Sequence, residues 1–316
     1  MSALAVRRIG EGPILHPGLC PSIGDNLNGP TLLRAPDWAG APAPWLLYFG
    51  HHEGRFIRLA LAERPEGPWR VHRSARGGEP RGVLHLAETW FAQTQPDAPQ
   101  PDWAVARGVN GLYPHISSPE VWVDPAARRF TMLFHGMDVR GTQVTARASS
   151  PNGLDWTVEP APVSDTTYLR AFRHGGRDYA IARLGEIQAM VADGRYGAGI
   201  FPFERRHRHA GVLVRGDRLH VFWTRIGDAP EAILHSTIDL SAPFEAWRVE
   251  GARRVLAPER DWEGAGLPVV PTPVGTAAGP ENGLRDPYLV ADGDRLLMVY
   301  AGAGESALGL AELTGL

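Results

Sequence analysis

Cysteine is the scarcest residue of this 316-residue sequence, which contains a single one, Cys20. One thiol excludes an internal disulfide and any cysteine-rich zinc site. Long apolar segments are lacking as well: no apolar run reaches the roughly 18 residues of a membrane-spanning helix. The N-terminal MSALAVRRIGEGPIL lacks the extended apolar stretch of a secretion signal. We therefore expect a cytoplasmic protein with no membrane partner.

An excess of one charge is also lacking, because the formal net charge is only -3. This balance gives no electrostatic basis for nucleic acid as a partner. The sequence has no Walker loop, HExxH, GxSxG elbow or dinucleotide fingerprint in a strand-to-helix context. Helical periodicity is hard to find. With membrane and nucleic acid excluded, we expect the partner to be a substrate, either a small molecule or an oligosaccharide. The sequence leaves the oligomeric state open.

What the sequence does have is a repeated pattern of short strands. Five segments begin near Asn28, Ser117, Thr167, Arg208 and Leu284. Each contains an apolar strand, a tight turn, an aromatic-rich strand, a glycine-containing loop and a third strand. Turns such as Gly216-Asp217 supply the left-handed conformations that hairpins need. Short strand units repeated in this way predict an all-β fold, a five-bladed β-propeller.

The fifth segment ends after three strands, so we expect Ala5 to Leu15 to supply its outer strand. That closure predicts one domain over residues 1–316. Two insertions, at about 74–112 and 251–282, interrupt the pattern, and insertions of this length are often functional. They carry Trp90, Trp103 and Trp262, which are candidates for a platform that stacks on a sugar or, equally, for loop anchors.

Three stretches resemble blades of five-bladed glycoside hydrolases: LRDPYLVADGDRLLMVY, SPEVWVDPAARRFTMLF and NGPTLLRAP. The resemblance is to family 43 and to its relatives in families 32, 62, 68, 117 and 130. It implies three carboxylates on the inner strands: a base or nucleophile, a general acid, and a third that tunes the acid. By this resemblance Glu120 matches the tuning carboxylate, and Asp286 occupies an Asp-Pro strand start.

The sequence departs from that family pattern at three blades. In the first, the expected Asp-Pro reads Gly29-Pro30, which leaves Asn28 or Asp25 as the nearest substitute. In the fourth, His209 or a neighbour stands where the general acid is expected. The third offers Tyr168 and Arg170 but no carboxylate. The usual carboxylate triad is therefore incomplete.

Histidine is plentiful where the carboxylates are lacking. Inner-strand starts and the loops after the second strands should share one face of the propeller, and the candidates there for a metal site are His52, His115, His135, His174 and His209. Neutral imidazoles could hold one divalent metal ion, whose identity the sequence leaves open. They could instead act as general acids or as hydrogen-bond donors. Arg170, Arg208 and Arg285 near the same face suit an acidic substrate.

We therefore interpret the chain as a carbohydrate-active enzyme, a glycosidase acting on a small or acidic glycan in the central funnel. Glu120, Asp286 and Asp25 would be its carboxylates and His209 or His115 its proton donor. Substrate contacts would come from Asn28, His52, Arg170, Arg208, Arg285, Trp90, Trp103 and Trp262. One alternative is a metal-dependent lyase, hydrolase or tailoring enzyme acting on a non-glycosidic small molecule. The other is a non-catalytic sugar-binding propeller.

A predicted hairpin tests this placement. His115 and His135 lie about ten residues either side of a turn at Asp124 to Arg128. Opposed residues of antiparallel strands have Cβ atoms roughly 4.5–5.5 Å apart. We expect both rings to face the central funnel, with Glu120 beside them or deeper on the same wall.

Overall fold

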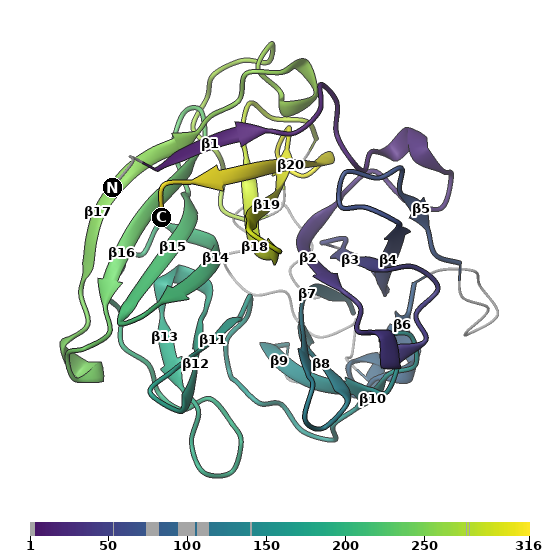
Figure 1. Ribbon diagram of the computed structural model, residues 1–316, viewed down its shortest axis with the longest axis vertical. Coiled ribbons are helices and arrows are strands. Elements are labelled where there is room, and N and C mark those ends of the chain that lie inside the picture. The colour runs from purple at the N-terminus through teal and green to yellow at the C-terminus, as the bar shows by residue number, and fades with distance from the viewer. Residues whose placement is uncertain are drawn as a thin grey trace.

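The computed structural model describes residues 4–73 except 53, then 82–93, 105, 114–139, 141–275, 277 and 279–316. Its sheets surround a central axis as the five blades of a β-propeller (Figure 1). The predicted fold class is thus confirmed. Among the described residues, no helix is long and apolar enough to cross a membrane.

Each blade is an antiparallel sheet whose strands run outward from the axis in chain order. Blade 1 contains β2 (Asn28–Arg34), β3 (Trp45–Gly50), β4 (Phe56–Ala62), β5 (Arg70–Val71) and β6 (Leu84–His85). Blade 2 contains β7 (Ile116–Asp124), β8 (Arg129–Met137), β9 (Gln143–Ser150) and β10 (Thr157–Val158). Blade 3 has three strands, β11 (Arg170–His174), β12 (Arg177–Ile181) and β13 (Ile187–Ala189).

Blade 4 contains β14 (His207–Arg215), β15 (Arg218–Arg225), β16 (Ile233–Asp239) and β17 (Val249–Leu256). Blade 5 contains β18 (Arg285–Asp292), β19 (Arg295–Gly302) and β20 (Ala307–Thr314), and its outer strand is β1 (Ala5–Arg8). The N-terminal strand pairs antiparallel with the C-terminal one, Ala5 opposite Thr314. The two ends of the chain are therefore joined in one sheet.

Short 3-10 turns connect the strands: η1 (Pro17–Leu19), η2 (Asp37–Ala39), η4 (Leu86–Glu88), η5 (Trp90–Gln93), η6 (Arg183–Gly185), η7 (Phe244–Ala246) and η8 (Asp261–Glu263). The turn between β14 and β15 is Gly216-Asp217, and Gly216 adopts a φ of 56°. This left-handed conformation is the one that the short hairpin turn requires. The local sequence thus fixes where these strands reverse.

The apolar core lies between the blades. The cluster between blades 1 and 2 includes Leu46, Tyr48, Phe130 and Phe134, all at most 1% exposed. Alternate residues of these strands face the neighbouring blade, as a period of two requires. Similar clusters join blades 5 and 1, 3 and 4, and 4 and 5. The cluster between blades 2 and 3 is much smaller.

Candidate functional site

The inner strands of blades 1, 2, 4 and 5 each have a bulge near their start. The pairing register shifts between Asn28 and Thr31, Ser117 and Glu120, His207 and Ala210, and Arg285 and Tyr288. Gly29, Ser118 and Asp286 lie within such bulges and have φ values of 52°, 50° and 52°, and Tyr168, just before β11, has a φ of 60°. For the non-glycine residues this conformation costs about 1–2 kcal/mol each. The repeated strain marks the axis as the place to look for function.

The same geometry explains why blade 1 lacks the expected aspartate. A Cβ added at Gly29 would lie 2.6 Å from Cα of Ser118 in blade 2. No side chain fits there without moving the backbone. The Gly29 N–H instead donates to Oδ2 of Asp286 at 2.8 Å. A carboxylate from blade 5 therefore reaches the position that the first blade leaves empty.

Tyr168 lies among three histidines near the axis. Its ring centroid lies 4.4 Å from that of His135, 4.1 Å from that of His209 and 6.3 Å from that of His52. The side chain is partly exposed, whereas the three histidines are at most 8% exposed. Tyr168 is therefore the member of this group most open to a molecule at the axis.

One carboxylate–imidazole pair adjoins the phenol. His52 Nδ1 lies 2.5 Å from Oε2 of Glu305, and His52 Nε2 lies 3.1 Å from the Tyr168 hydroxyl. The Asn28 amide, 2.7 Å from His52 Nδ1, also holds the ring. The nearby His52 and Arg285 lower the pKa of Glu305 despite its burial, so this carboxyl is ionised. Glu305, His52 and Tyr168 thus form a continuous hydrogen-bonded chain.

A second pair lies on the other side of the tyrosine. His209 Nδ1 contacts Oδ1 of Asp286, a carboxylate that is fully buried. Burial, together with the neighbouring Arg208, lowers the pKa of His209 well below its usual value. In a neutral His209 the Nδ1–H donates to Asp286, and Nε2 keeps a lone pair. Nε2 has no hydrogen-bond partner among the described residues. His209 is therefore suited to accept a proton, not to donate one as the sequence predicted.

His115 and His135 meet near the axis, as the hairpin predicted. Their ring centroids are 5.5 Å apart and both residues are 1% exposed. His135 is opposite Ser117 in the register. Burial lowers the pKa of His135 well below its usual value, and His115 adds to the effect. At neutral pH His135 is uncharged and packs against Tyr168.

Glu120 lies on the face of blade 2 that also carries His135, buried further along the strands. The bulge between Ser117 and Glu120 places Glu120 opposite Leu133, which is two residues from His135 on the same face of β8. There Oε2 accepts a hydrogen bond from Arg170 at 2.7 Å and Oε1 accepts one from the Ala171 N–H. Burial raises the pKa of Glu120, although Arg170 opposes the shift. Glu120 and Arg170 form a buried ion pair between blades 2 and 3.

The three arginines predicted to meet an acidic substrate are all buried and ion-paired. Arg170, Arg208 and Arg285 are 6%, 5% and 0% exposed. Arg208 Nε donates to Glu231 at 2.8 Å, and Arg285 bridges Glu231, Glu281 and Glu305. Their charge is already neutralised inside the protein. They position the site's acidic side chains and do not face a ligand.

Asp25 and Asn28, the two possible substitutes for the first-blade carboxylate, lie in different surroundings. The Asp25 side chain is 93% exposed and pairs with His51, 3.3 Å away, at the rim. It does not replace the family's first-blade carboxylate. Asn28 is fully buried; besides holding His52, its Oδ1 accepts a hydrogen bond from the Ser117 hydroxyl at 3.0 Å. Asn28 therefore positions His52 and does not meet a substrate.

Three more predicted residues lie away from the axis. Trp90 stacks on Phe91 and donates to the Glu159 carbonyl, and Trp262 packs on Gly302 and donates to the Glu11 carbonyl. Both are loop anchors. His174 ends β11 at the far edge of the blade, 3.7 Å from Asp217. Trp103 lies outside the described residues.

The histidines do not form a metal site within the described part of the chain. No group of three histidine, cysteine, aspartate or glutamate side chains there has a geometry that could hold an ion. His52 and His209 already use their Nδ1 atoms on Glu305 and Asp286. The metal therefore stays a sequence prediction, and no step below depends on it.

Sequence reasoning gave no role to Tyr168 or Glu305. Both lay in segments predicted to face the funnel, but tyrosine is not one of the carboxylates that the resemblance implied. Their positions at a strand start and at a second-to-third-strand loop were the available signal. Only the structure shows that His52 joins them.

Comparison with known proteins agrees with the fold. No family profile matches the chain. An uncharacterized protein of Acanthamoeba polyphaga mimivirus is 29% identical over 322 residues, covering 91% of this chain and 83% of that protein. The propeller is similar to those of glycoside hydrolases.

Two solved structures illustrate this similarity. A predicted glycoside hydrolase from Parabacteroides distasonis has a TM-score of 0.66 at 12% identity, covering 97% of this chain and 95% of its own. A family-43 enzyme from Xanthomonas citri in complex with xylotriose has a TM-score of 0.59 at 10% identity, with coverages of 96% and 90%. At these identities the likeness establishes the five-bladed glycoside hydrolase fold.

Proposed function

We propose that the protein is a glycan-cleaving enzyme whose chemistry takes place at Tyr168. One observation carries the proposal: two carboxylate–imidazole pairs, Glu305–His52 and Asp286–His209, converge on a partly exposed phenol at the propeller axis. Propellers of the same fold include an enzyme solved with xylotriose, which supports a glycan as the substrate. Titratable groups with shifted pKa values in a shared site are typical of catalysis.

The two sides of Tyr168 suit opposite proton transfers. His209, whose pKa is lowered, takes a proton from water, and the water oxygen bonds to the anomeric carbon. The bond from that carbon to the leaving oxygen breaks, and this oxygen takes the Tyr168 phenol proton. His52, within hydrogen-bond distance, then returns a proton to the phenol oxygen. The net reaction is hydrolysis, and the cycle closes when His209 releases its proton to solvent and His52 takes one up from solvent.

A second reaction uses the same two groups without water. Asp286 and Glu305 are at most 1% exposed and both hold histidines, so neither resembles the open carboxylate pair of ordinary glycosidases. If the sugar carries a carboxylate, His209 can remove the proton from the carbon next to it. Electrons of that C–H bond then form a double bond to the next carbon, the bond from that carbon to the leaving oxygen breaks, and this oxygen takes the Tyr168 proton. This β-elimination would make the protein a lyase.

The test is product analysis with neutral and acidic oligosaccharides, including xylotriose and oligogalacturonates. Hydrolysis adds water to the products, whereas elimination yields an unsaturated sugar that absorbs ultraviolet light. We expect Tyr168→Phe to lose about 10²–10⁴-fold in kcat. Tyr179→Phe, in the core of the same blade, is the control. Binding without any turnover, or full activity of Tyr168→Phe, would overturn the proposal.

A further inference from the structure

The boundary between blades 2 and 3 is unlike the other boundaries in the propeller. The apolar cluster between blades 1 and 2 has 21 buried residues, whereas the one between blades 2 and 3 has six: Leu133, Val163, Leu169, Ala180, Ala182 and Tyr196. Propeller blades are held together by apolar burial at these faces, which stabilises by roughly 25 cal/mol per Å². At this boundary most of that stabilisation is absent.

The cause is a polar face on blade 2. Residues that face blade 1, such as Val121 and Phe130, are apolar, but the alternate residues include the polar Thr131, Arg147 and Ser149. Trp122 pairs with Thr131, which pairs with Ser149, and these three side chains form a row across β7, β8 and β9. Asp124 pairs with Arg129 in a second row. Polar residues at positions where the fold calls for apolar ones mark a functional surface.

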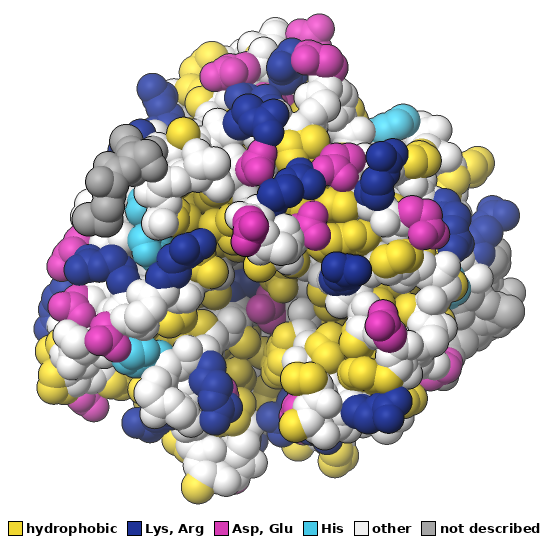
Figure 2. Space-filling model, in the orientation of Figure 1, with side chains coloured by type: hydrophobic (Ala, Val, Ile, Leu, Met, Phe, Trp, Pro, Cys, Tyr) yellow, Lys and Arg dark blue, Asp and Glu magenta, His cyan; other side chains and the backbone are white. Residues whose placement is uncertain are grey.

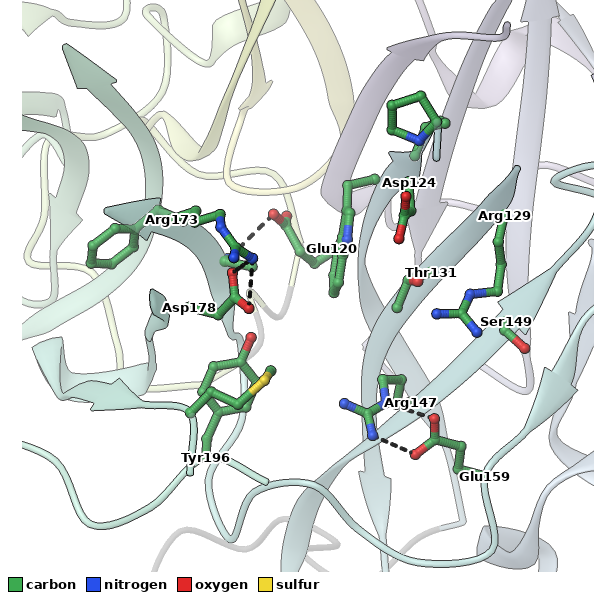
Figure 3. Close-up of a pocket in the computed structure, with 16 residues that line it drawn as sticks. Glu120, Asp124, Arg129, Thr131, Arg147, Ser149, Glu159, Arg173, Asp178 and Tyr196 are labelled. Carbon is green, nitrogen blue, oxygen red and sulfur yellow. Dashed lines mark hydrogen bonds and ion pairs between the residues drawn. The ribbon is translucent and has the colours of Figure 1, made fainter. Parts of the chain in front are cut away.

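These rows line an open cleft. Its volume is about 690 Å³, within the range of small-molecule sites. Figure 2 shows the molecule hollowed between the two blades, below the centre of the view. Figure 3 shows Arg173, Asp178 and Tyr196 on the blade 3 side, opposite Thr131, Arg129 and Ser149 on blade 2. Blade 3 has only three strands, so less of the sheet covers this wall.

The charges in the cleft are largely paired. Arg147 makes two parallel hydrogen bonds to Glu159, at 2.7 and 2.8 Å, and Arg173 pairs with Asp178 at 3.0 Å. The lining has three arginines, Arg129, Arg147 and Arg173, and four carboxylates, Glu120, Asp124, Glu159 and Asp178. An anionic ligand would therefore gain little and would meet nearby carboxylates.

The groups left for a ligand are hydroxyls, one guanidinium and an aromatic face. The Thr131 and Ser149 hydroxyls and the Arg129 guanidinium have no hydrogen-bond or ion-pair partner among the described residues. Trp122 is partly exposed beside them. Planar donors, small hydroxyls and an indole ring match the alternating hydroxyls and C–H faces of an uncharged sugar.

We propose that this cleft is a second carbohydrate-binding site, separate from the axis, that holds a short neutral oligosaccharide. It lies beyond the buried Glu120–Arg170 pair, which separates it from Tyr168. The proposal does not depend on catalysis at Tyr168. The cleft would hold a glycan chain while the site at Tyr168 cleaves it, or it would bind a glycan in a protein that catalyses no reaction.

Binding is measured by titration calorimetry with xylotriose, cellotriose and maltotriose, using Tyr168→Phe protein to prevent turnover. Trp122→Leu and Thr131→Val should each weaken binding of the preferred trisaccharide about tenfold, since each removes about 1–1.5 kcal/mol of contact. Thr157→Val on the outer strand of the same blade should bind normally. Arg129→Ala alters an exposed side chain, so the fold should be unchanged, and this variant should also bind more weakly.

Two results would overturn the proposal. One is that none of the three trisaccharides binds at millimolar concentration. The other is that Trp122→Leu, Thr131→Val and Arg129→Ala, with unchanged thermal midpoints, bind as tightly as the parent. A different result would show that only the catalytic proposal at Tyr168 is wrong: the protein would cleave no glycan but would still bind a trisaccharide, and Trp122→Leu would weaken that binding.

Discussion

Strand β7 connects two regions of opposite character. His115, just before its start, lies at the axis, where the space between Gly29, Ser118, Tyr168 and His209 amounts to about 10 Å³. Trp122, near its other end, borders a cleft of about 690 Å³. At the axis charged groups are buried and paired; in the cleft the Arg173 side chain is 65% exposed even within its ion pair.

The difference follows from propeller geometry. Inner strands converge at the axis, so a side chain there contacts residues from several blades: His209 of blade 4 contacts Asp286 of blade 5 and Tyr168 of blade 3. Away from the axis a gap has only two blades around it, and a blade with three strands leaves it open. Contacts from many blades fix groups precisely for chemistry, whereas an open cleft suits binding. The predictions below test this division.

The largest effect should come from His209→Gln at the axis. Glutamine cannot accept a proton, so kcat should fall about 10²–10⁴-fold, with the fold unchanged. The wild-type pH profile gives a second readout. Because the pKa of His209 is lowered, the base is unprotonated at neutral pH, and activity should persist until the pH falls well below 6.5. An acid limb centred at 6.5 or above would contradict this assignment.

Arg285→Met should give the largest loss of stability. The change removes a fully buried cation and leaves the carboxylates of Glu231, Glu281 and Glu305 close together. Leaving buried charge unpaired costs about 3–5 kcal/mol. Urea unfolding at neutral pH measures this loss, with the exposed Arg218→Met on blade 4 as the control. A loss below about 1 kcal/mol would show that these carboxylates are not held as ions.

The sequence predicts the fold better than it predicts the roles of the residues in the candidate site. Glycine turns and alternating apolar residues are local, so they predicted the blades and which face carries the site. The direction of Glu120 depended on a bulge at Ser118, and one inserted residue reverses the face of all that follow. Arg285 was predicted to meet substrate because its partner Glu231 is 54 residues away and had no local signal. Strand alternation predicts which face of a blade a side chain is on, but partners distant in the sequence decide what that side chain does.

His207→Phe should remove part of the pH dependence of stability. His207 stacks on Trp223, and burial lowers its pKa to about 3, with neither ring nitrogen hydrogen-bonded to any residue that the structure describes. The unfolded chain binds the proton near pH 6.5, so stability falls as the pH decreases from 6.5 toward 3. Between pH 6.5 and 5 the wild type should lose about 1.6 kcal/mol more than the variant. Urea unfolding at both pH values checks this; equal losses would mean that folding does not lower the pKa of His207.

The smallest effect should come from Arg173→Ala in the cleft. Its ion pair with Asp178 has side chains 65% and 39% exposed, so solvent screens the attraction. We expect the free energy of unfolding to change by less than about 0.5 kcal/mol, in contrast to Arg285→Met. Raising the salt concentration should reduce even that difference, because the pair is open to ions. A loss of 2 kcal/mol or more, insensitive to salt, would show that the cleft is closed in solution and that its polar wall supports the fold and not a ligand.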